Sequence, residues 1–366
     1  MKIERAIISG GGTGGHIFPA IAIADEIKRR NPKAEILFVG ANGKMEMEKV
    51  PTAGYKIKGL TIAGFQRKLT LSNFLLPFKI IASLWYAIKI IKEFKPQVVI
   101  GVGGYASGPT LQAATLLKIP TLIQEQNSFP GKTNKILANK VSSICTAYEG
   151  LEKFFPKNKI VLTGNPVRPE MIQTEGKRNE AFEFYGLNPD KKTILVIGGS
   201  LGARTLNESI KSQLQELQKN DIQVLWQCGK VYVDSLTKEL EGTNLDGIKM
   251  VQFIARMDLA YTIADLIISR AGAISVSELC LVNKPVILVP SPNVAEDHQT
   301  KNAMALVNKN AAVLVTDIEA REKLVKKAID ILKDHEIKTN LIIEISKLGK
   351  PDATASIVNE IEKIVK

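Results

Sequence analysis

Short apolar runs alternate along the chain with longer segments in which apolar residues recur at helical spacing. The runs expected to form strands occupy residues 6–9, 35–39, 97–102, 120–124, 193–197, 223–227, 266–269, 285–289 and 312–315. The clearest helical segments are residues 18–30, 77–94, 109–117 and 205–219. Near-continuous Val, Ile and Leu strands separated by helices indicate parallel sheets that are covered on both faces. The pattern therefore predicts an α/β fold.

The alternation stops in a polar stretch at residues 165–190 and then starts again. Both halves open in the same way, with a strand that enters a glycine loop at Gly10 and again at Gly198. The length of 366 residues suffices for two domains with complete cores. We expect two doubly wound, Rossmann-like domains that face each other across a cleft, with ligands at the carboxyl ends of the strands.

The composition, with 45% hydrophobic and 23% charged residues, is that of an ordinary globular protein and excludes a disordered tail or a collagen-like fibre. The three cysteines, Cys145, Cys228 and Cys280, form no CxxC pair, so their spacing fits neither a disulfide framework nor a structural zinc site. The first residues lack the apolar core of a secretory signal, and no run approaches 18 uncharged apolar residues. We therefore expect a cytoplasmic protein that does not span a membrane.

The positive charge lies in the first half of the chain. Residues 1–165 contain 23 lysine and arginine residues against 10 acidic ones, so their net charge of +13 exceeds the +12 of the whole chain. Residues 60–92 combine basic residues with Phe65, Phe74, Phe78, Trp85 and Tyr86. A helix from about Pro77 to Phe94 would be strongly apolar with lysines on its flank, which favours an anionic membrane surface over nucleic acid. The alternative is a solvated lysine-rich face, with the aromatic residues buried.

Two glycine loops follow strands of the first half. Residues 10–16 read Gly-Gly-Gly-Thr-Gly-Gly-His and formally contain the dinucleotide-binding pattern GxGxxG. The acidic residue that such a site needs for the ribose is absent after the second strand, where residues 38–42 read Phe-Val-Gly-Ala-Asn. Residues 103–109, Gly-Gly-Tyr-Ala-Ser-Gly-Pro, repeat the strand-to-helix setting. Two such helix starts in a basic domain favour a polyanionic substrate such as a diphosphate over two unliganded turns.

Two further loops lie in the second half. Residues 198–202, Gly-Gly-Ser-Leu-Gly, match the GxSxG nucleophile elbow of α/β-hydrolases. Only His298 and His335 could complete a triad there, and a hydrolase leaves the first domain without a role. Residues 270–278 combine small residues, which leave N–H groups free for a diphosphate, with Glu278 at the end, where a carboxylate can accept from both hydroxyls of a ribose. The alternative is a helix start with a solvent-facing glutamate.

Together these motifs resemble those of the MurG family of bacterial N-acetylglucosaminyltransferases. The resemblance extends through Glu125-Gln126-Asn127, residues 163–168 (Thr-Gly-Asn-Pro-Val-Arg) and residues 297–303 (Asp-His-Gln-Thr-Lys-Asn-Ala), so it covers the chain from residue 10 to beyond residue 300. It implies the GT-B fold. Residues 1–165 with a C-terminal helix at 352–366 would form the acceptor- and membrane-facing domain, and residues 166–351 the donor-binding domain.

The resemblance also implies the reaction. The family transfers N-acetylglucosamine from UDP-N-acetylglucosamine to the 4-hydroxyl of undecaprenyl-diphospho-muramoyl-pentapeptide, converting lipid I to lipid II in peptidoglycan synthesis, with inversion at the anomeric carbon. We therefore expect a hexosyltransferase at the cytoplasmic side of the cell membrane, docked through residues 60–92, with no metal cofactor and no nucleic-acid partner. A UDP-sugar epimerase, another lipid glycosyltransferase on the same fold, and a non-enzymatic module for RNA or lipid stay open as alternatives.

Site residues follow from positions in the family's motifs. For the donor these are Arg168, Ser200, Ile254, Ala273, Ile274, Ser275, Glu278 and Gln299; for the sugar and the reacting region, Thr13, Gly14, Gly15 and Asn127; for the acceptor, Tyr105, Ser107 and Glu125. Arg168 and the helix starts would stabilise the leaving diphosphate.

The acceptor hydroxyl must lose a proton during transfer, and His16, beside two glycines that admit a sugar, is the candidate base. Packing of the helix start is the alternative role for this histidine. The chain departs from the family's pattern at Gln124, where some members carry histidine, and at Ala255-Arg256, which can be acidic in relatives. Because glutamine is neutral, a general base at position 124 is excluded.

Overall fold

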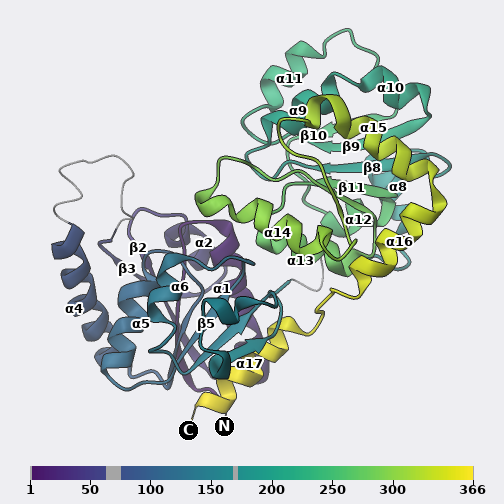
Figure 1. Cartoon of the computed structure of the whole chain (residues 1–366). Coiled ribbons are helices and arrows are strands. Elements are labelled where there is room, and N and C mark those ends of the chain that lie inside the picture. Colours follow the sequence, from purple (N-terminus) through teal and green to yellow (C-terminus); the bar gives the residue numbers. More distant parts are fainter. Residues whose placement is uncertain (1, 63–75, 168–171, 366) are drawn as a thin grey trace. The chain divides into compact units, whose positions relative to one another are not determined.

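The chain forms two compact units in the computed structural model, which describes residues 2–62, 76–167 and 172–365 (Figure 1). The first unit comprises Met1–Val167 together with Lys350–Lys366, and the second comprises Arg168–Gly349. From the sequence we expect one domain formed by residues 1–165 with 352–366 and a second formed by residues 166–351. Which ligand each unit binds stays a prediction.

A seven-stranded parallel sheet forms the middle of the first unit, in the order β3-β2-β1-β4-β5-β6-β7. Its strands are β1 (Arg5–Ser9), β2 (Glu35–Ala41), β3 (Lys56–Leu60), β4 (Val98–Gly101), β5 (Thr121–Glu125), β6 (Ser143–Thr146) and β7 (Ile160–Leu162). The helical segments are α1 (Gly14–Arg30), α2 (Glu46–Thr52), α4 (Leu76–Phe94), α5 (Ser107–Leu116), α6 (Lys132–Leu137), η1 (Leu151–Lys153), η2 (Lys157–Lys159) and α17 (Ala353–Ile364).

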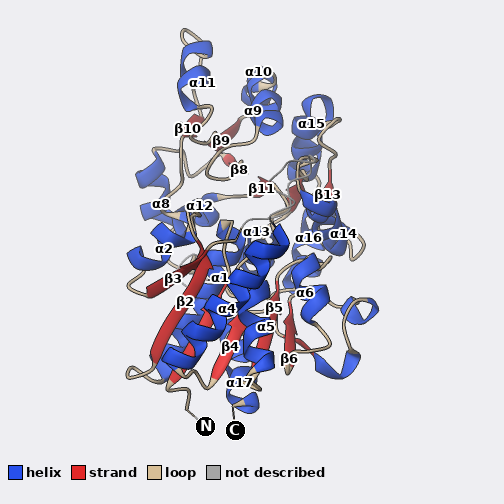
Figure 2. Ribbon diagram, turned by 90° about the vertical axis from the view of Figure 1, so that its left-hand side faces the viewer, coloured by secondary structure: helices blue, strands red, loops and turns tan. Residues whose placement is uncertain are grey.

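Helices cover both faces of this sheet (Figure 2). Side chains alternate along a strand, so Ile7 and Ile8 of β1 point to opposite faces. Ile8 packs in a cluster with α1 and α17, whereas Ile7 packs with α4, α5 and α6. Both side chains are fully buried, which explains why the strand reads as a continuous apolar run.

The second unit repeats this architecture with a six-stranded parallel sheet, in the order β10-β9-β8-β11-β12-β13. Its strands are β8 (Lys192–Ile197), β9 (Ile222–Gln227), β10 (Ile248–Val251), β11 (Leu266–Ser269), β12 (Val286–Leu288) and β13 (Val313–Leu314). The helical segments are α8 (Arg178–Tyr185), α9 (Arg204–Lys211), α10 (Leu214–Lys219), α11 (Val233–Glu239), α12 (Met257–Ile263), α13 (Ala273–Val282), η3 (Ala295–Asp297), α14 (His298–Val307), α15 (Ala320–Lys333) and α16 (His335–Ser346).

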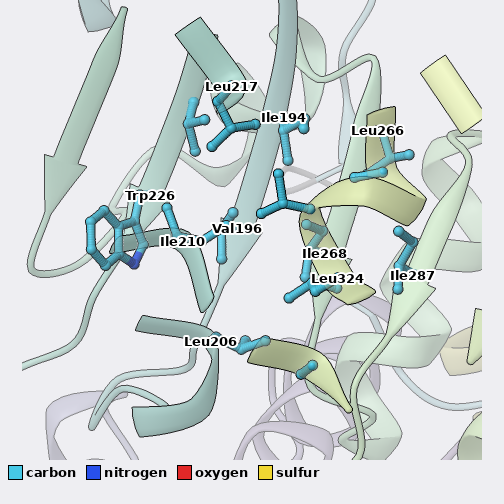
Figure 3. Close-up of a cluster of buried hydrophobic side chains, with 14 of the residues drawn as sticks. Ile194, Val196, Leu206, Ile210, Leu217, Trp226, Leu266, Ile268, Ile287 and Leu324 are labelled. Carbon is cyan, nitrogen blue, oxygen red and sulfur yellow. The ribbon is translucent and has the colours of Figure 1, made fainter. Parts of the chain in front are cut away.

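One core cluster of the second unit packs the inner strands against α9, α10 and α15 (Figure 3). Trp226 of β9 is its largest fully buried side chain. The indole Nε1–H donates to Oδ1 of Asn207 in α9 at 2.9 Å, so the polar end of the ring is satisfied inside the core. Strand and helix are thereby joined by both apolar and polar contacts.

The predicted fold class, two doubly wound α/β units, is confirmed. One predicted element is wrong: the helix expected at residues 205–219 is two helices, α9 and α10, which separate at Ser212 and Gln213. The hydroxyls of Ser209 and Ser212 donate to the carbonyl oxygens of Thr205 and Ser209. Serine side chains that bond to nearby carbonyl groups compete with the helical pattern, and here they accompany its interruption.

In each sheet the chain order reverses at one place, between β1 and β4 in the first unit and between β8 and β11 in the second. Ligands of doubly wound sheets bind outside the carboxyl ends of the strands at this switch point. Residues 10–16 follow β1 and residues 103–106 follow β4, whereas residues 198–203 follow β8 and residues 270–272 follow β11. All four loops singled out in the sequence therefore lie at switch points.

Candidate active site

The two glycine loops of the first unit pack backbone against backbone. Gly103 and Gly104 have φ values of +98° and +88°, a region that favours glycine. A Cβ atom on Gly104 would lie 2.4 Å from the carbonyl oxygen of Gly11, too close for any side chain. The close approach of the two loops therefore requires glycine, and the ring of His16 lies against Gly103.

His16 lies in the first turn of α1 and is half-buried. Its Nδ1 is 2.9 Å from the carbonyl oxygen of Gly11. A carbonyl can only accept, so Nδ1 carries a proton in this hydrogen bond, and in the neutral form of the ring the lone pair lies on Nε2. A Cβ atom on Gly103 would lie 2.8 Å from Nε2, so glycine at this position keeps the nitrogen uncovered. The geometry suits a group that accepts a proton at Nε2.

The N-terminus of α1 presents backbone donors beside His16. Thr13 is the N-cap residue, no side chain caps the helix, and its first turn contains no acidic residue. Thr13 and Gly15 are exposed and Gly14 is half-buried. Uncapped N–H groups at a helix N-terminus attract oxygen atoms that carry partial or full negative charge. These three residues can therefore contact the polar groups of a sugar or a phosphate.

Glu125 ends β5 and is 1% exposed. Its carboxylate accepts from the backbone N–H of Asn127 at 3.0 Å, from the N–H of Gly131 at 3.1 Å, and from Nδ2 of Asn134 at 2.7 Å. This burial favours a role in shaping its loop over the predicted contact with an acceptor. Asn127, half-buried in the same loop, is positioned by this carboxylate.

The other two predicted acceptor residues differ in exposure. Tyr105 is 50% exposed and is free to meet a substrate, whereas Ser107 is fully buried at the start of α5. Gln124 is also buried, with its Nε2 donating to Oδ1 of Asn165 at 2.9 Å. Nδ2 of Asn165 in turn donates to the carbonyl oxygen of Gln126 at 3.0 Å. A neutral amide network therefore surrounds position 124.

A cavity of about 600 Å³ lies at the switch point of the second unit. The glycine loop with the end of β8, α9, the end of β11 with the loop after it, α13 and the segment from Ser291 to Gln299 line this cavity, together with Tyr232 and Asp317. The lining residues are Ile197, Gly198, Gly199, Gly202, Ala203, Arg204, Thr205, Tyr232, Ser269, Arg270, Gly272, Ser275, Ser291, Pro292, Asn293, Gln299 and Asp317. Of the residues predicted for the donor, Ser275 and Gln299 line this cavity.

The polar groups of this cavity are held in place by neighbours. The backbone N–H of Ser291 donates to Oε1 of Gln299 at 2.9 Å, which leaves the amide NH₂ of Gln299 as a donor. The guanidinium of Arg270 donates to the carbonyl oxygens of Val289 and Pro290 and to Asp317. The cavity thus presents amide donors together with the N–H groups of Arg270, whose charge is paired with that of Asp317, and these donors suit a phosphorylated ligand.

Glu278 lies in α13, one turn after Ser275, and outside the residues that line the cavity. Tyr261 of α12 donates its hydroxyl to Oε2 of Glu278 at 3.2 Å. Burial, and then the negative charge of Glu278, raise the pKa of Tyr261 well above its usual value, so the tyrosine is a protonated donor at neutral pH. The carboxylate is therefore held in one orientation.

The other residues predicted to bind the donor lie in different surroundings. Ser200 is exposed, and its carbonyl oxygen accepts from the N–H of Lys230 at 3.0 Å. Ala273 and Ile274 are half-buried at the start of α13, and Ile254 is 2% exposed, which leaves its side chain in the core. Arg168 lies outside the described residues.

Arg256, one of the two departures from the family's pattern, bonds within its own unit. It donates from Nε and Nη2 to the carboxylate of Asp258, and this bond, followed by one from Lys177, holds the pKa of Asp258 below its usual range. Arg256 therefore belongs to the contact between α8 and α12 and does not line the cavity.

The outer side of α4 carries a stripe of apolar and basic side chains. Trp85 is 70% exposed and Ile81 is 54% exposed, and Lys89 and Lys92 continue the same stripe toward the end of the helix. Ala87, Ile90 and Ile91 on the opposite side are buried. None of the described helices combines the length and the apolar character needed to cross a bilayer. Phe65, Phe74 and the rest of residues 63–75 lie outside the described residues, as does the side chain of Phe78.

Comparison with known proteins decides the family. Residues 6–146 match the model of the glycosyltransferase family 28 N-terminal domain, and residues 193–355 match that of its C-terminal domain. A "UDP-N-acetylglucosamine--N-acetylmuramyl-(pentapeptide) pyrophosphoryl-undecaprenol N-acetylglucosamine transferase" of Parabacteroides distasonis is 56% identical over 365 residues, covering 100% of this chain and 99% of its own. The chain belongs to the MurG family of glycosyltransferases. A relative of the same name from Flavobacterium psychrophilum is 53% identical, with the same coverage.

Solved structures agree with this family and with the GT-B class. MurG of Acinetobacter baumannii matches this MurG-family chain with a TM-score of 0.80 at 30% identity, covering 98% of this chain and 99% of that one. A UDP-GlcNAc 2-epimerase from Neisseria meningitidis matches with a TM-score of 0.68 at 15% identity, covering 98% and 99%. The second likeness shows a shared fold alone.

Three residues of this MurG-family site were missed in the sequence. Tyr261, Asp317 and Glu46 each orient a site residue or a site loop, but none lies in a motif. Asp317 lies 47 positions from Arg270, and Glu46 lies 34 positions from Gly12, so no local spacing links them to their partners. Among the described residues, no group of three or more His, Cys, Asp or Glu side chains could hold a metal ion.

Proposed function

We propose that this glycosyltransferase moves N-acetylglucosamine from UDP-N-acetylglucosamine to the 4-hydroxyl of lipid-linked muramoyl-pentapeptide, forming lipid II from lipid I. The observation that carries the proposal is the full-length similarity to transferases whose printed name states this donor and this acceptor. The similarity spans both units, so it includes both sets of switch-point loops.

The donor is assigned to the cavity of the second unit. Gln299 and the N–H groups at the start of α13 supply hydrogen bonds to the diphosphate, and Arg270, which is ion-paired with Asp317, supplies further N–H donors. Glu278 accepts from the hydroxyls of the ribose, in an orientation set by Tyr261. Arg168, Ser200, Ile254, Ala273 and Ile274 keep their proposed places around the UDP group on the strength of the family's motifs.

The acceptor is assigned to the first unit, where His16 acts as the base. Nε2 takes the proton of the sugar's 4-hydroxyl while that oxygen bonds to the anomeric carbon of the donor, and the bond to the UDP oxygen breaks on the opposite face, which inverts the anomeric centre. Thr13, Gly14, Gly15 and Asn127 orient the sugar groups near this nitrogen, and Tyr105 meets the acceptor from its exposed position. The free lone pair at Nε2 supports this role.

The lipid-linked acceptor is reached through the exposed stripe of α4. Trp85 and Ile81 supply the apolar contact, and Lys89 and Lys92 attract anionic headgroups at about 1 kcal/mol each. We therefore propose a peripheral protein at the cytoplasmic face of the membrane, and the excess positive charge of residues 1–165 supports this. Nucleic acid has no part in the proposal, and neither does a metal cofactor.

The proposal is tested by incubating the full chain with labelled UDP-N-acetylglucosamine and a lipid I analogue in vesicles. Label should appear in the lipid product with the β configuration, and the rate should not fall when EDTA is added. Release of UDP in the absence of acceptor, with conversion of the donor sugar to its 2-epimer, would contradict transfer and support the epimerase alternative. A protein with no affinity for UDP would point to a binding module.

A further inference from the structure

Glu46, in the first turn of α2, is a buried carboxylate that the proposed mechanism does not use. It is 1% exposed. The backbone N–H of Gly12 donates to Oε2 at 2.8 Å, and the N–H of Ala41 donates to Oε1 at 2.9 Å. Both oxygens of the side chain therefore act as acceptors of backbone hydrogen bonds. Within the described ranges, Glu46 forms no ion pair.

Two glycines make room for this carboxylate. A Cβ atom on Gly11 would lie 2.2 Å from Cδ of Glu46, and one on Gly40 would lie 2.6 Å from its Cγ. Neither glycine has a positive φ, so the backbone conformation does not demand glycine at these positions. The absence of side chains here is explained by the space that Glu46 occupies.

A single peptide group connects Glu46 with His16. The N–H of Gly12 and the carbonyl of Gly11 belong to the same planar peptide unit and point in opposite directions. The N–H end is bound by Glu46, and the carbonyl end accepts from Nδ1 of His16 at 2.9 Å. A hydrogen bond donated from one end of a peptide polarises the group and strengthens the hydrogen bond accepted at the other end. Fixing the N–H direction also fixes where the carbonyl points.

Glycine on both sides makes this peptide easy to turn. Gly12 has a φ of +84°, and glycine crosses between backbone regions at little steric cost. If the peptide turned over, the carbonyl oxygen would leave Nδ1 and the N–H would take its place. His16 would then lose the acceptor that keeps its proton on Nδ1. Glu46 opposes this turn because it accepts from the N–H group in the observed orientation.

We propose that Glu46 is a positioning residue for His16, acting through the Gly11–Gly12 peptide to keep the imidazole proton on Nδ1 and the lone pair on Nε2. This inference rests on the proposed role of His16 as the base. It resembles the way in which a carboxylate orients a catalytic histidine by direct contact, with one peptide group interposed. Its consequence is that a residue without substrate contact controls the proton-accepting atom.

The ring proton can be located by long-range ¹H–¹⁵N spectra of the full chain labelled at histidine. The signals of His16 are assigned by their loss in His16→Ala. We expect the wild-type neutral ring to carry its proton on Nδ1. In Glu46→Gln we expect a shift toward the Nε2-protonated form, because the amide cannot accept with both of its polar atoms. The matched control is Glu48→Gln in the same helix, whose carboxylate is exposed and should leave the spectrum unchanged.

Transfer kinetics give the second readout. Glu46→Gln should lower kcat at least about tenfold, with the KM for UDP-N-acetylglucosamine within about twofold of the wild type. Gly11→Ala should produce the same tautomer shift, because its Cβ atom would displace the carboxylate while leaving the glutamate in the chain. If Glu46→Gln does not fold, Gly11→Ala still tests the proposal.

The proposal is overturned if wild-type His16 carries its proton on Nε2, or if the two variants leave both the tautomer and kcat unchanged. Either result would leave the proposed transfer reaction intact, because His16→Ala would still lower the rate. A wild-type chain that transfers no sugar would instead contradict the proposed function. The tautomer measurement on the free protein would still test whether Glu46 controls the protonation of His16.

Discussion

Single polar side chains set the geometry of both switch-point sites. Glu125 accepts hydrogen bonds from the loop that contains Asn127. Tyr261 donates to Glu278, and Asp317 accepts from Arg270. The residues expected to meet ligand lie in recognisable motifs, and sequence reasoning found them there. Glu125 lies two positions from Asn127 within a motif, whereas Tyr261 and Asp317 lie 17 and 47 positions from their partners. The roles of Tyr261 and Asp317 became visible only when the fold brought each to its partner.

The pair of Tyr261 and Glu278 yields a prediction about UDP affinity. Glu278→Ala should weaken UDP binding by about one to two decades, since bonds from hydroxyls to a carboxylate contribute roughly 1.5–3 kcal/mol. Tyr261→Phe should weaken it by about three- to tenfold, because the carboxylate loses one orienting donor. Calorimetric titration with UDP measures both effects.

Tyr185→Phe is the matched control for this titration. Tyr185 lies in the same unit, and its hydroxyl donates to the carbonyl oxygen of Arg256, away from the cavity. It should bind UDP as the parent does. Unchanged affinity in both Glu278→Ala and Tyr261→Phe would remove this pair from the donor site.

Most strands with a clear apolar pattern were predictable, and several short or mixed ones were not. Leu266–Ser269 agrees with its predicted range, and the predicted inner strands differ by a residue or two at their ends. By contrast, β6, β7 and β10 were not predicted, and neither was β3, whose apolar residues are interrupted by Lys56 and Lys58. It is an edge strand, where lysine is common because it discourages pairing with other chains. The pattern of α4 predicted a helix but not which of its aromatic residues would be exposed.

The stripe on α4 yields a prediction about membrane binding. Replacing Lys89 and Lys92 with glutamate should lower affinity for anionic vesicles by about thirtyfold or more at moderate salt, since each lysine contributes about 1 kcal/mol and each glutamate repels. UDP affinity should not change, because the donor cavity belongs to the second unit. Sedimentation with vesicles of anionic lipid measures the effect.

The control for this charge change is the double replacement of Lys326 and Lys327 by glutamate. Both lysines are exposed on α15 of the second unit, so the net charge of the protein changes equally. This variant should sediment like the parent. If the two double variants bind vesicles alike, net charge and not the stripe governs docking.

At the scale of the whole molecule, the same doubly wound plan occurs twice, and each copy places glycine loops at its switch point. This repetition was readable in the sequence, because each half opens with an apolar strand and a glycine loop. The contacts that make the loops work were not, since Gly104 against Gly11 and Gly202 against Cys228 join segments far apart in the chain. The sequence therefore predicted the positions of these loops more readily than how each loop is held.

The most direct test of the proposed reaction is the rate of sugar transfer by His16→Ala. If Nε2 of His16 accepts the acceptor's proton, kcat should fall by about 10²–10⁴ while UDP affinity stays within about twofold of the parent. His335→Ala, which removes an exposed histidine from α16, should transfer at the parental rate. A His16→Ala variant that transfers N-acetylglucosamine at a near-normal rate would contradict the assignment of His16 as the base.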